Sequence, residues 1–160
     1  MNMDGDKQIL PIRIRSVLID DFAELYEIGK TTPEFRVSAT EDFMDVDEFK
    51  WSITNPDGIF LVAEERNKKI GFIYANAKDM ERPFEHKYAC LVYLVVMSEF
   101  RGQGIARKLY TECETKLKEI GVTNIYGWAN AETEGGILNF MKKNGFLEGH
   151  KYVWMDKKIL

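Results

Sequence analysis

The sequence contains little cysteine, little histidine and no long apolar run. Two cysteines and two histidines occur among 160 residues, and Cys90 and Cys113 are too far apart for a Cys-x-x-Cys site. We therefore expect no disulfide framework and no metal site, and we expect both thiols to be buried in a reducing compartment. No apolar stretch approaches the roughly 20 residues of a membrane-spanning helix. The polar opening MNMDGDKQ is unlike a signal peptide.

Positive charge is also in short supply. The chain has 22 Lys and Arg against 26 Asp and Glu, a formal net charge of −4, whereas binding to nucleic acid requires a basic surface. We therefore expect a cytoplasmic protein with no nucleic-acid partner and no membrane partner. A chain of this length can bury one core. We assign residues 11–160 to a single domain and residues 1–10 to a flexible N-terminal segment.

Hydrophobic periodicity predicts an alternation of strands and helices. Strands are expected at 11–18, 59–65, 70–77, 88–97, 124–129 and 151–159. Helices are expected after Asp20 or Asp21, after Thr40, over 105–120 and over 133–144. This order indicates an α/β fold with a mixed, mostly antiparallel, twisted sheet of about six to seven strands and helices on both faces.

One stretch, VVMSEFRGQGIARKL at residues 95–109, joins the longest apolar run to the most regular amphipathic helix. Gly102 and Gly104 stand just before the first helical turn, where backbone N–H groups lack partners and the helix dipole is positive. Glycines leave out the Cβ atoms that would keep an anion away from these groups. Arg101 and Arg107 add positive charge. The stretch therefore predicts a phosphate-binding loop; the alternative is a turn that only joins strand to helix.

The glycine spacing excludes two common nucleotide motifs. A Walker A loop ends in Gly-Lys-Ser/Thr, which is absent, and the third glycine of a dinucleotide fingerprint is replaced by Arg107. The remaining pattern is Arg-x-x-Gly-x-Ala, formed by Arg101, Gly104 and Ala106. It resembles the acyl-CoA binding signature of the GNAT superfamily of N-acetyltransferases. The segment FMKKNGF at 140–146 resembles the Phe-Tyr-Glu-Lys-x-Gly-Phe segment of the same family.

The resemblance extends from Ile12 to the end of the chain and implies a GNAT-like fold with acetyl-CoA as co-substrate. In that fold the loop amides hold the CoA pyrophosphate. A bulge in the preceding strand splays it from the next strand, and the pantetheine arm lies between these splayed central strands. The resemblance thus assigns cofactor binding to Leu94, Val95, Val96, Arg101, Gly102, Gln103, Gly104, Ile105, Ala106, Arg107 and Phe140.

The resemblance does not supply a catalytic acid or base. In many relatives a tyrosine of the second segment is the candidate acid, and here that position is Met141, which cannot donate a proton. The family's asparagine falls at Glu134, and the positions of a frequent glutamate base are Cys90 and Val92. Other groups must take these roles, or the proximity of the bound reactants must suffice.

Four side chains could take these roles, each with a structural alternative. Tyr93 lies near the expected thioester and is the candidate catalytic residue, or else a core aromatic. Asn130 could bind the pantetheine arm or the substrate, or it could only end a strand. Glu64 and Glu65 could act as a base through a water molecule, or they could be solvated residues at a strand end.

Residues 31–57 contain seven carboxylates against two basic residues. This segment could form a negative rim that attracts a cationic amine, or a solvated helix face. We predict an N-acetyltransferase that transfers an acetyl group from acetyl-CoA directly to a primary amine of a small molecule or a protein, as a monomer or a homodimer. One alternative is a non-catalytic CoA-binding module or sensor. Another is an interaction domain whose splayed sheet accepts a peptide strand.

Overall fold

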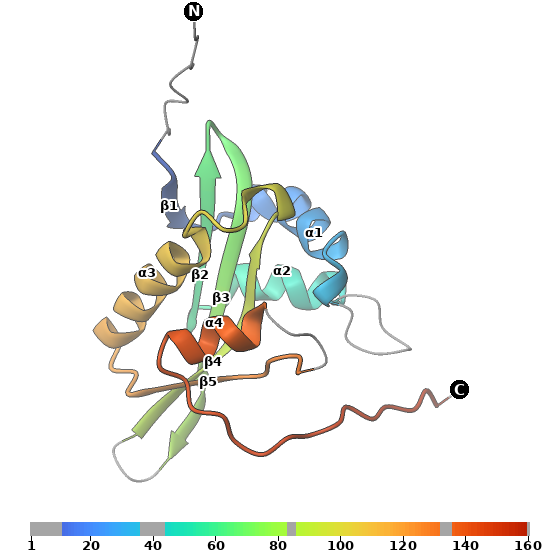
Figure 1. The fold of residues 1–160 in the computed structure, drawn as a ribbon, viewed down its shortest axis with the longest axis vertical. Coiled ribbons are helices and arrows are strands. Elements are labelled where there is room, and N and C mark those ends of the chain that lie inside the picture. Colours follow the sequence, from blue (N-terminus) through green and yellow to red (C-terminus); the bar gives the residue numbers. More distant parts are fainter. Residues whose placement is uncertain (1–10, 36–43, 83–85, 132–135, 160) are drawn as a thin grey trace, which may run out of the picture.

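The computed structural model describes residues 11–35, 44–82, 86–131 and 136–159, without the side chains of 78–82 (Figure 1). The expected flexible segment 1–10, the expected helix cap Thr40 and Glu134 lie outside these residues. Among the helices described, none combines the length and the hydropathy that a membrane crossing requires.

The strands form one mixed sheet in the order β1-β2-β3-β4-β5. They are β1 (Arg13–Ser16), β2 (Gly58–Glu65), β3 (Lys68–Arg82), β4 (His86–Val96) and β5 (Asn124–Gly127). The first four strands pair in antiparallel fashion, and β5 runs parallel to β4. The prediction of an α/β fold with a mixed sheet is confirmed.

The number of strands is a correction, because the described residues contain five and not six to seven. Residues 151–159, expected as the last strand, form no strand and run along the outside of the fold (Figure 1). The side chains of 152–155 are 69% to 89% exposed. An alternating or apolar sequence can pair only where a neighbouring strand lies about 4.8 Å away, and this segment has no such neighbour among the described residues.

The β2–β3 hairpin is longer than predicted because its turn is very short. Arg66 and Asn67 alone connect the strands, with φ of 49° and 65°, and Glu65 pairs with Lys68. Two positive φ values are the mark of a two-residue turn whose twist matches that of the strands. The sequence expectation of a hairpin is confirmed.

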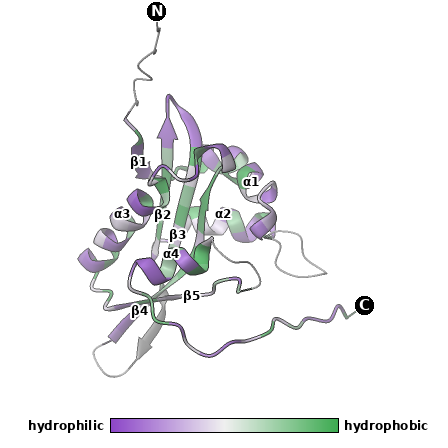
Figure 2. Cartoon of the chain, in the orientation of Figure 1, coloured by the Kyte–Doolittle hydropathy of each residue, from purple (hydrophilic) through white to green (hydrophobic). Residues whose placement is uncertain are grey.

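Helices cover both faces of the sheet, as predicted (Figure 1). The helices α1 (Phe22–Lys30) and α2 (Val46–Thr54) lie on one face, and α3 (Ile105–Glu119) and α4 (Ile137–Lys143) lie on the other. Short 3₁₀ turns η1 (Ile19–Asp21), η2 (Pro33–Phe35) and η3 (Ser98–Phe100) connect these elements. In Figure 2 the middle of the sheet is hydrophobic, whereas the tip of the β2–β3 hairpin is hydrophilic.

Two helix starts differ from the sequence expectation. Helix α2 begins at Val46, where the carboxylate of Asp45 accepts hydrogen bonds from Asp47 N at 2.8 Å and Glu48 N at 3.1 Å. Asp21 stands at the start of α1 without capping it. Its carboxylate instead accepts from Leu18 N at 2.8 Å and from the Arg15 guanidinium at 2.7 and 2.9 Å. A bidentate, charge-assisted hydrogen bond to arginine is stronger than the N-cap hydrogen bond that the carboxylate would otherwise accept.

Candidate active site

Strand β4 contains the expected bulge. Tyr74 of β3 pairs with Tyr93, and the next residue, Ala75, pairs with Leu91, so that Val92 is the extra residue. A bulge bends its strand and increases the local twist. The bend lies in the middle of β4, which is the strand that the sequence placed before the glycine loop.

The ladder between β4 and β5 ends at this bulge. It runs from the pair Tyr88 and Asn124 to the pair Leu91 and Gly127, where β5 ends. Strand β4 continues to Val96, and over these last residues it has a strand partner only in β3 among the described residues. The central strands are therefore splayed, as the resemblance implied.

The main chain of β4 beyond the bulge presents alternate groups on its free side. Met97 N donates to Ile70 O on the β3 side at 2.9 Å. The N–H and C=O groups of successive residues in a strand point to opposite sides. The backbone groups of Val95 therefore also point to β3, and those of Leu94 and Val96 point away from it. We call this side the open edge. Of the three β4 residues predicted to contact pantetheine, two thus direct their backbone groups to this side, although Val96 O already accepts from Arg101 Nε there.

The glycine loop, residues 101–104, leads into α3 with two left-handed residues. Gly102 and Gly104 have φ of +75° and +78°, and a Cβ built on either would meet open space. Backbone conformation, and not crowding, therefore requires glycine here. The first helical bond is from Lys108 N to Gly104 O at 3.1 Å. Within the described chain no acceptor takes the N–H groups of residues 102–107.

The side chains of the loop take different directions. Arg101 donates from Nε to Val96 O at 2.9 Å and from Nη1 to Glu34 Oε1 of η2 at 2.8 Å. The hydrogen bond from Arg101 lowers the pKa of Glu34 below its usual value. Ile105 is buried, Ala106 is half-buried, and Gln103 and Arg107 are exposed. The sequence predicted a cationic side chain at residue 101, but it did not indicate that Glu34, in the connection between α1 and α2, would be its partner.

A cleft of about 2270 Å³ passes the splay, bounded by β4, β5, α3, α4, η2 and the C-terminal segment. This is larger than a typical ligand pocket of up to about 1,000 Å³, because the extended residues 147–154 form part of its wall. The lining residues used below are Glu34, Phe35, Met44, Val92, Tyr93, Tyr110, Gly127, Asn130 and Met141.

The cleft brings some predicted site residues together and leaves others outside. Tyr93 and Asn130 both line it, although they lie on either side of α3 in the sequence. Phe140 does not line the cleft, but its ring lies 5.8 Å from the ring of Tyr110, which does. The glycine loop does not line the cleft itself and is joined to it through Glu34, which bonds Arg101.

Tyr93 belongs both to the cleft and to the aromatic core. It is 6% exposed, its hydroxyl contacts the sulfur of Met44, and its ring stacks on Tyr74 at 5.7 Å. Burial, together with the charge of Glu48, raises its pKa above the usual value. The phenol is therefore neutral at physiological pH, as a donor must be, but it is a weaker acid than free tyrosine.

Other candidates for chemistry are excluded by their surroundings. Glu64 does not line the cleft, and its carboxylate accepts from Arg15 Nε of the edge strand β1 at 3.1 Å, so it is already engaged in an ion pair. Cys113 is 1% exposed, and burial raises its pKa to about 12, so it remains a thiol. Cys90 is half-buried, not buried as expected.

Met141, at the position of the family's tyrosine, is part of the cleft wall. It is 6% exposed, and a Cβ added to Gly127 would lie 3.2 Å from its Cε and 3.0 Å from Leu91 O. The end of β5 thus needs glycine because β4 and α4 approach it closely. No proton donor stands at residue 141, as the sequence already indicated.

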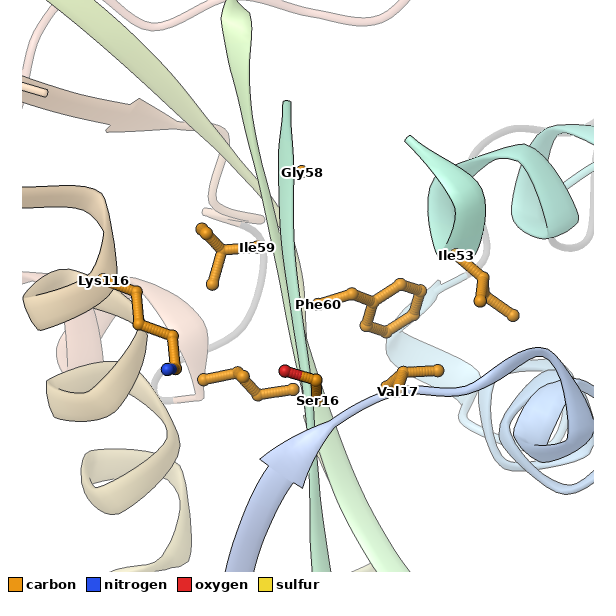
Figure 3. Close-up of a pocket in the computed structure, with 8 residues that line it drawn as sticks. Ser16, Val17, Ile53, Gly58, Ile59, Phe60 and Lys116 are labelled. Carbon is orange, nitrogen blue, oxygen red and sulfur yellow. The ribbon is translucent and has the colours of Figure 1, made fainter. Parts of the chain in front are cut away.

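A second pocket is remote from the splay and much smaller. It has about 140 Å³ and lies between α2, α3 and the point where β1 leaves β2. In Figure 3, Lys116 approaches from one side of these strands, and Phe60, Ile53 and Val17 stand on the other. Its volume is below that of a typical ligand site, so we assign it no function.

Tyr110, Phe35 and Met44 line the cleft but were not singled out from the sequence. Tyr110 follows Leu109 on the apolar side of α3, where an aromatic residue is expected to be core. Phe35 and Met44 border residues 36–43, which belonged to an expected connection and helix start. Their contacts are made with β3 and β4, far away in the sequence, and no local pattern indicates them.

Comparison with known proteins agrees with this geometry. The model of the acetyltransferase (GNAT) family matches residues 21–146. An uncharacterized N-acetyltransferase of Methanocaldococcus jannaschii is 28% identical over 100 residues, which are 62% of this chain and 44% of that protein. The match thus spans less than half the length of this relative.

Solved acetyltransferase structures share the fold at low sequence identity. A predicted acetyltransferase of Clostridium acetobutylicum, solved with acetyl-CoA, has a TM-score of 0.73 and 19% identity, covering 91% of this chain and 96% of that one. An aminoglycoside acetyltransferase from an uncultured soil metagenomic sample, solved with sisomicin, has a TM-score of 0.70 and 18% identity, covering 92% and 96%. Because the family model matches most of this chain, the chain belongs to the acetyltransferase (GNAT) family.

Proposed function

We propose that this protein transfers an acetyl group from acetyl-CoA to a primary amine by direct attack, in the cytoplasm. One observation carries the proposal. The unpaired N–H groups of residues 102–107 lie at the end of a strand whose open edge leads to a cleft. Such a row of donors at a helix N-terminus binds phosphate. Strand splay provides an entry for an extended arm that carries a thioester.

The donor would bind mainly through the main chain. The pyrophosphate would accept from the N–H groups of the glycine loop and the first turn of α3, with Arg107 nearby. The pantetheine arm would pair with the backbone groups of Leu94 and with the N–H of Val96 along the open edge, much as an added strand would. Asn130 lines the cleft beyond β5 and is suited to bind the arm or the acceptor. The relative from Clostridium was solved with acetyl-CoA, which supports this choice of donor.

The reaction needs no covalent intermediate with the protein. The lone pair of the amine nitrogen attacks the thioester carbon, the tetrahedral intermediate collapses, and the C–S bond breaks with its electrons on sulfur. The nitrogen loses a proton to water, and the thiolate gains one. Neither cysteine is positioned as a nucleophile. Tyr93 is our candidate donor to the thiolate or to the carbonyl oxygen, and bound proximity supplies much of the acceleration.

The acceptor is a small molecule or a protein that carries a primary amine. Phe35 and Met44 give the α1–α2 side of the cleft an apolar wall. The exposed carboxylates of Asp47 and Glu48 stand on the same helix as Phe49, which contacts Tyr93. These charges favour the approach of a cation. The soil relative was solved with the aminoglycoside sisomicin, which makes polyamino sugars the first acceptors to test.

Turnover is tested with acetyl-CoA and a panel of amines. The panel holds an aminoglycoside, a polyamine, a lysine peptide and a peptide with a free N-terminus, together with a tertiary amine that cannot form an amide. We expect release of free CoA thiol and an acetylated product by mass spectrometry with at least one primary amine and none with the tertiary amine. Saturable binding of acetyl-CoA without any acetylated product would favour the non-catalytic CoA module.

A further inference from the structure

Tyr110 of α3 is buried between aromatic rings at the wall of the cleft. The residue is 6% exposed. Its ring meets Phe140 edge-on at 5.8 Å and lies tilted against Phe146, also at 5.8 Å. Phe140 lies in α4 and Phe146 in the segment that follows this helix, so the tyrosine ring of α3 is held by both. Its position is therefore fixed before any ligand arrives.

The hydroxyl of Tyr110 has no hydrogen-bond partner among the described residues, in contrast to the other tyrosines of the core. Tyr74 accepts from Asn55 Nδ2 at 2.9 Å, and Tyr26 donates to Met44 O at 3.0 Å. In the described part of the chain no fully buried side-chain polar atom lacks a partner, so the Tyr110 hydroxyl must reach the cleft that the residue lines. A buried ring with an unpaired hydroxyl costs free energy unless a ligand or water accepts from it.

The place of Tyr110 on α3 relates this hydroxyl to the donor site. The residue is five positions after Ile105, about 7.5 Å along the helix axis from the first helical turn. It therefore follows the unpaired N–H groups of 102–107 along α3, and it lines the same cleft as Gly127 and Val92. An extended arm that runs from those N–H groups to the splay must pass this level of the helix.

We propose that Tyr110 donates a hydrogen bond from its hydroxyl to an amide carbonyl of the pantetheine arm, and so is a donor-binding residue outside the glycine loop. The inference rests on the proposed function, since it needs CoA in the cleft. Burial supports the role of a donor, because it raises the pKa of Tyr110 to about 12. The phenol therefore keeps its proton over the whole physiological range.

The test compares two ligands on three proteins by calorimetric titration. CoA carries the pantetheine arm, whereas 3′-phosphoadenosine 5′-diphosphate keeps the nucleotide and the pyrophosphate without it. The proteins are wild type, Tyr110→Phe and Tyr26→Phe, whose hydroxyl lies on the other face of the sheet. We expect Tyr110→Phe to weaken CoA about tenfold, the effect of one lost hydrogen bond, and to bind the nucleotide like wild type. Tyr26→Phe should bind both ligands normally.

Thermal unfolding adds a readout that a purely structural role would not give. Without ligand, Tyr110→Phe should melt no lower than wild type, because it removes an unpaired hydroxyl, while its stabilisation by CoA should shrink. Equal CoA affinity in Tyr110→Phe and wild type would overturn the role of Tyr110 and leave the proposed function intact. Equal weakening of both ligands would also overturn it, as a structural effect. Failure of wild type to bind CoA would contradict the proposed function itself.

Discussion

At the scale of single residues, the clearest electrostatic feature is the pair of Asp21 and Arg15. The carboxylate is 5% exposed, and hydrogen bonding from Arg15 lowers its pKa from 3.8 to about 2. At about 1.4 kcal/mol for each tenfold change in proton affinity, this corresponds to about 2 kcal/mol of folding free energy at neutral pH. The pair fixes η1 to β1, which is the edge strand on the opposite side of the sheet from β4 and β5.

We predict that Asp21→Asn lowers the free energy of unfolding by about 2 kcal/mol at pH 7. As the pH falls from about 4 to about 2, the unfolded carboxyl takes up its proton first, and the stabilisation of the wild type is lost. The difference between the two proteins should therefore vanish near pH 2. Urea unfolding at several pH values measures this, with the exposed neighbour Asp20→Asn as control. A difference that stays constant down to pH 2 would contradict the assigned ion pair.

Residues whose role depends on the local backbone could be predicted from the sequence, and those that depend on distant contacts could not. Gly102 and Gly104 have positive φ at a helix start, and a glycine pair before a periodic segment indicates this directly. Tyr110 is different, because its ring is held by Phe140 and Phe146, which follow much later in the chain. The unpaired hydroxyl becomes visible only when these rings are placed.

At the scale of elements, helix α2 depends on its cap. Asp45 accepts from two backbone N–H groups, and the helix carries Phe49, whose ring is 6.0 Å from that of Tyr93. We predict that Asp45→Ala costs about 1 kcal/mol of stability and that Asp45→Asn, which retains a capping oxygen, costs clearly less. Urea unfolding of the three proteins decides this. Equal losses in both variants would show that the cap is not the source of the effect.

The same contrast separates elements that the sequence predicts well from those it does not. The β2–β3 hairpin, strand β4 and helix α3 are specified by their own residues, through a short turn, a continuous apolar run and a regular stripe. The sequence alone could not decide where α2 begins, because Thr40 and Asp45 are both residues that favour the N-cap position of a helix. The strand expected at 151–159 failed because pairing needs an edge elsewhere in the fold, which local periodicity cannot report.

At the scale of the whole molecule, two hydrophobic clusters on opposite faces hold the sheet, and the site lies where the sheet opens. Strand β5 ends at Gly127 while β4 continues to Val96. Helix α3 begins beyond the end of β4, which brings its free N–H groups to the open edge. The fold therefore forms a donor site mainly from the backbone, and this explains why a short glycine pattern could indicate it.

The central claim is that the glycine loop binds the donor, and the most direct test is a calorimetric titration of acetyl-CoA into wild type, Gly104→Trp and Gly121→Trp. Both glycines have positive φ, +78° and +84°, with open space around a Cβ, so both variants carry a similar strain of about 1–2 kcal/mol. Gly121 lies at the other end of α3. We predict tight, saturable binding to wild type and Gly121→Trp and none to Gly104→Trp. Binding to Gly104→Trp as tight as to wild type, or none to folded wild type, would contradict the account.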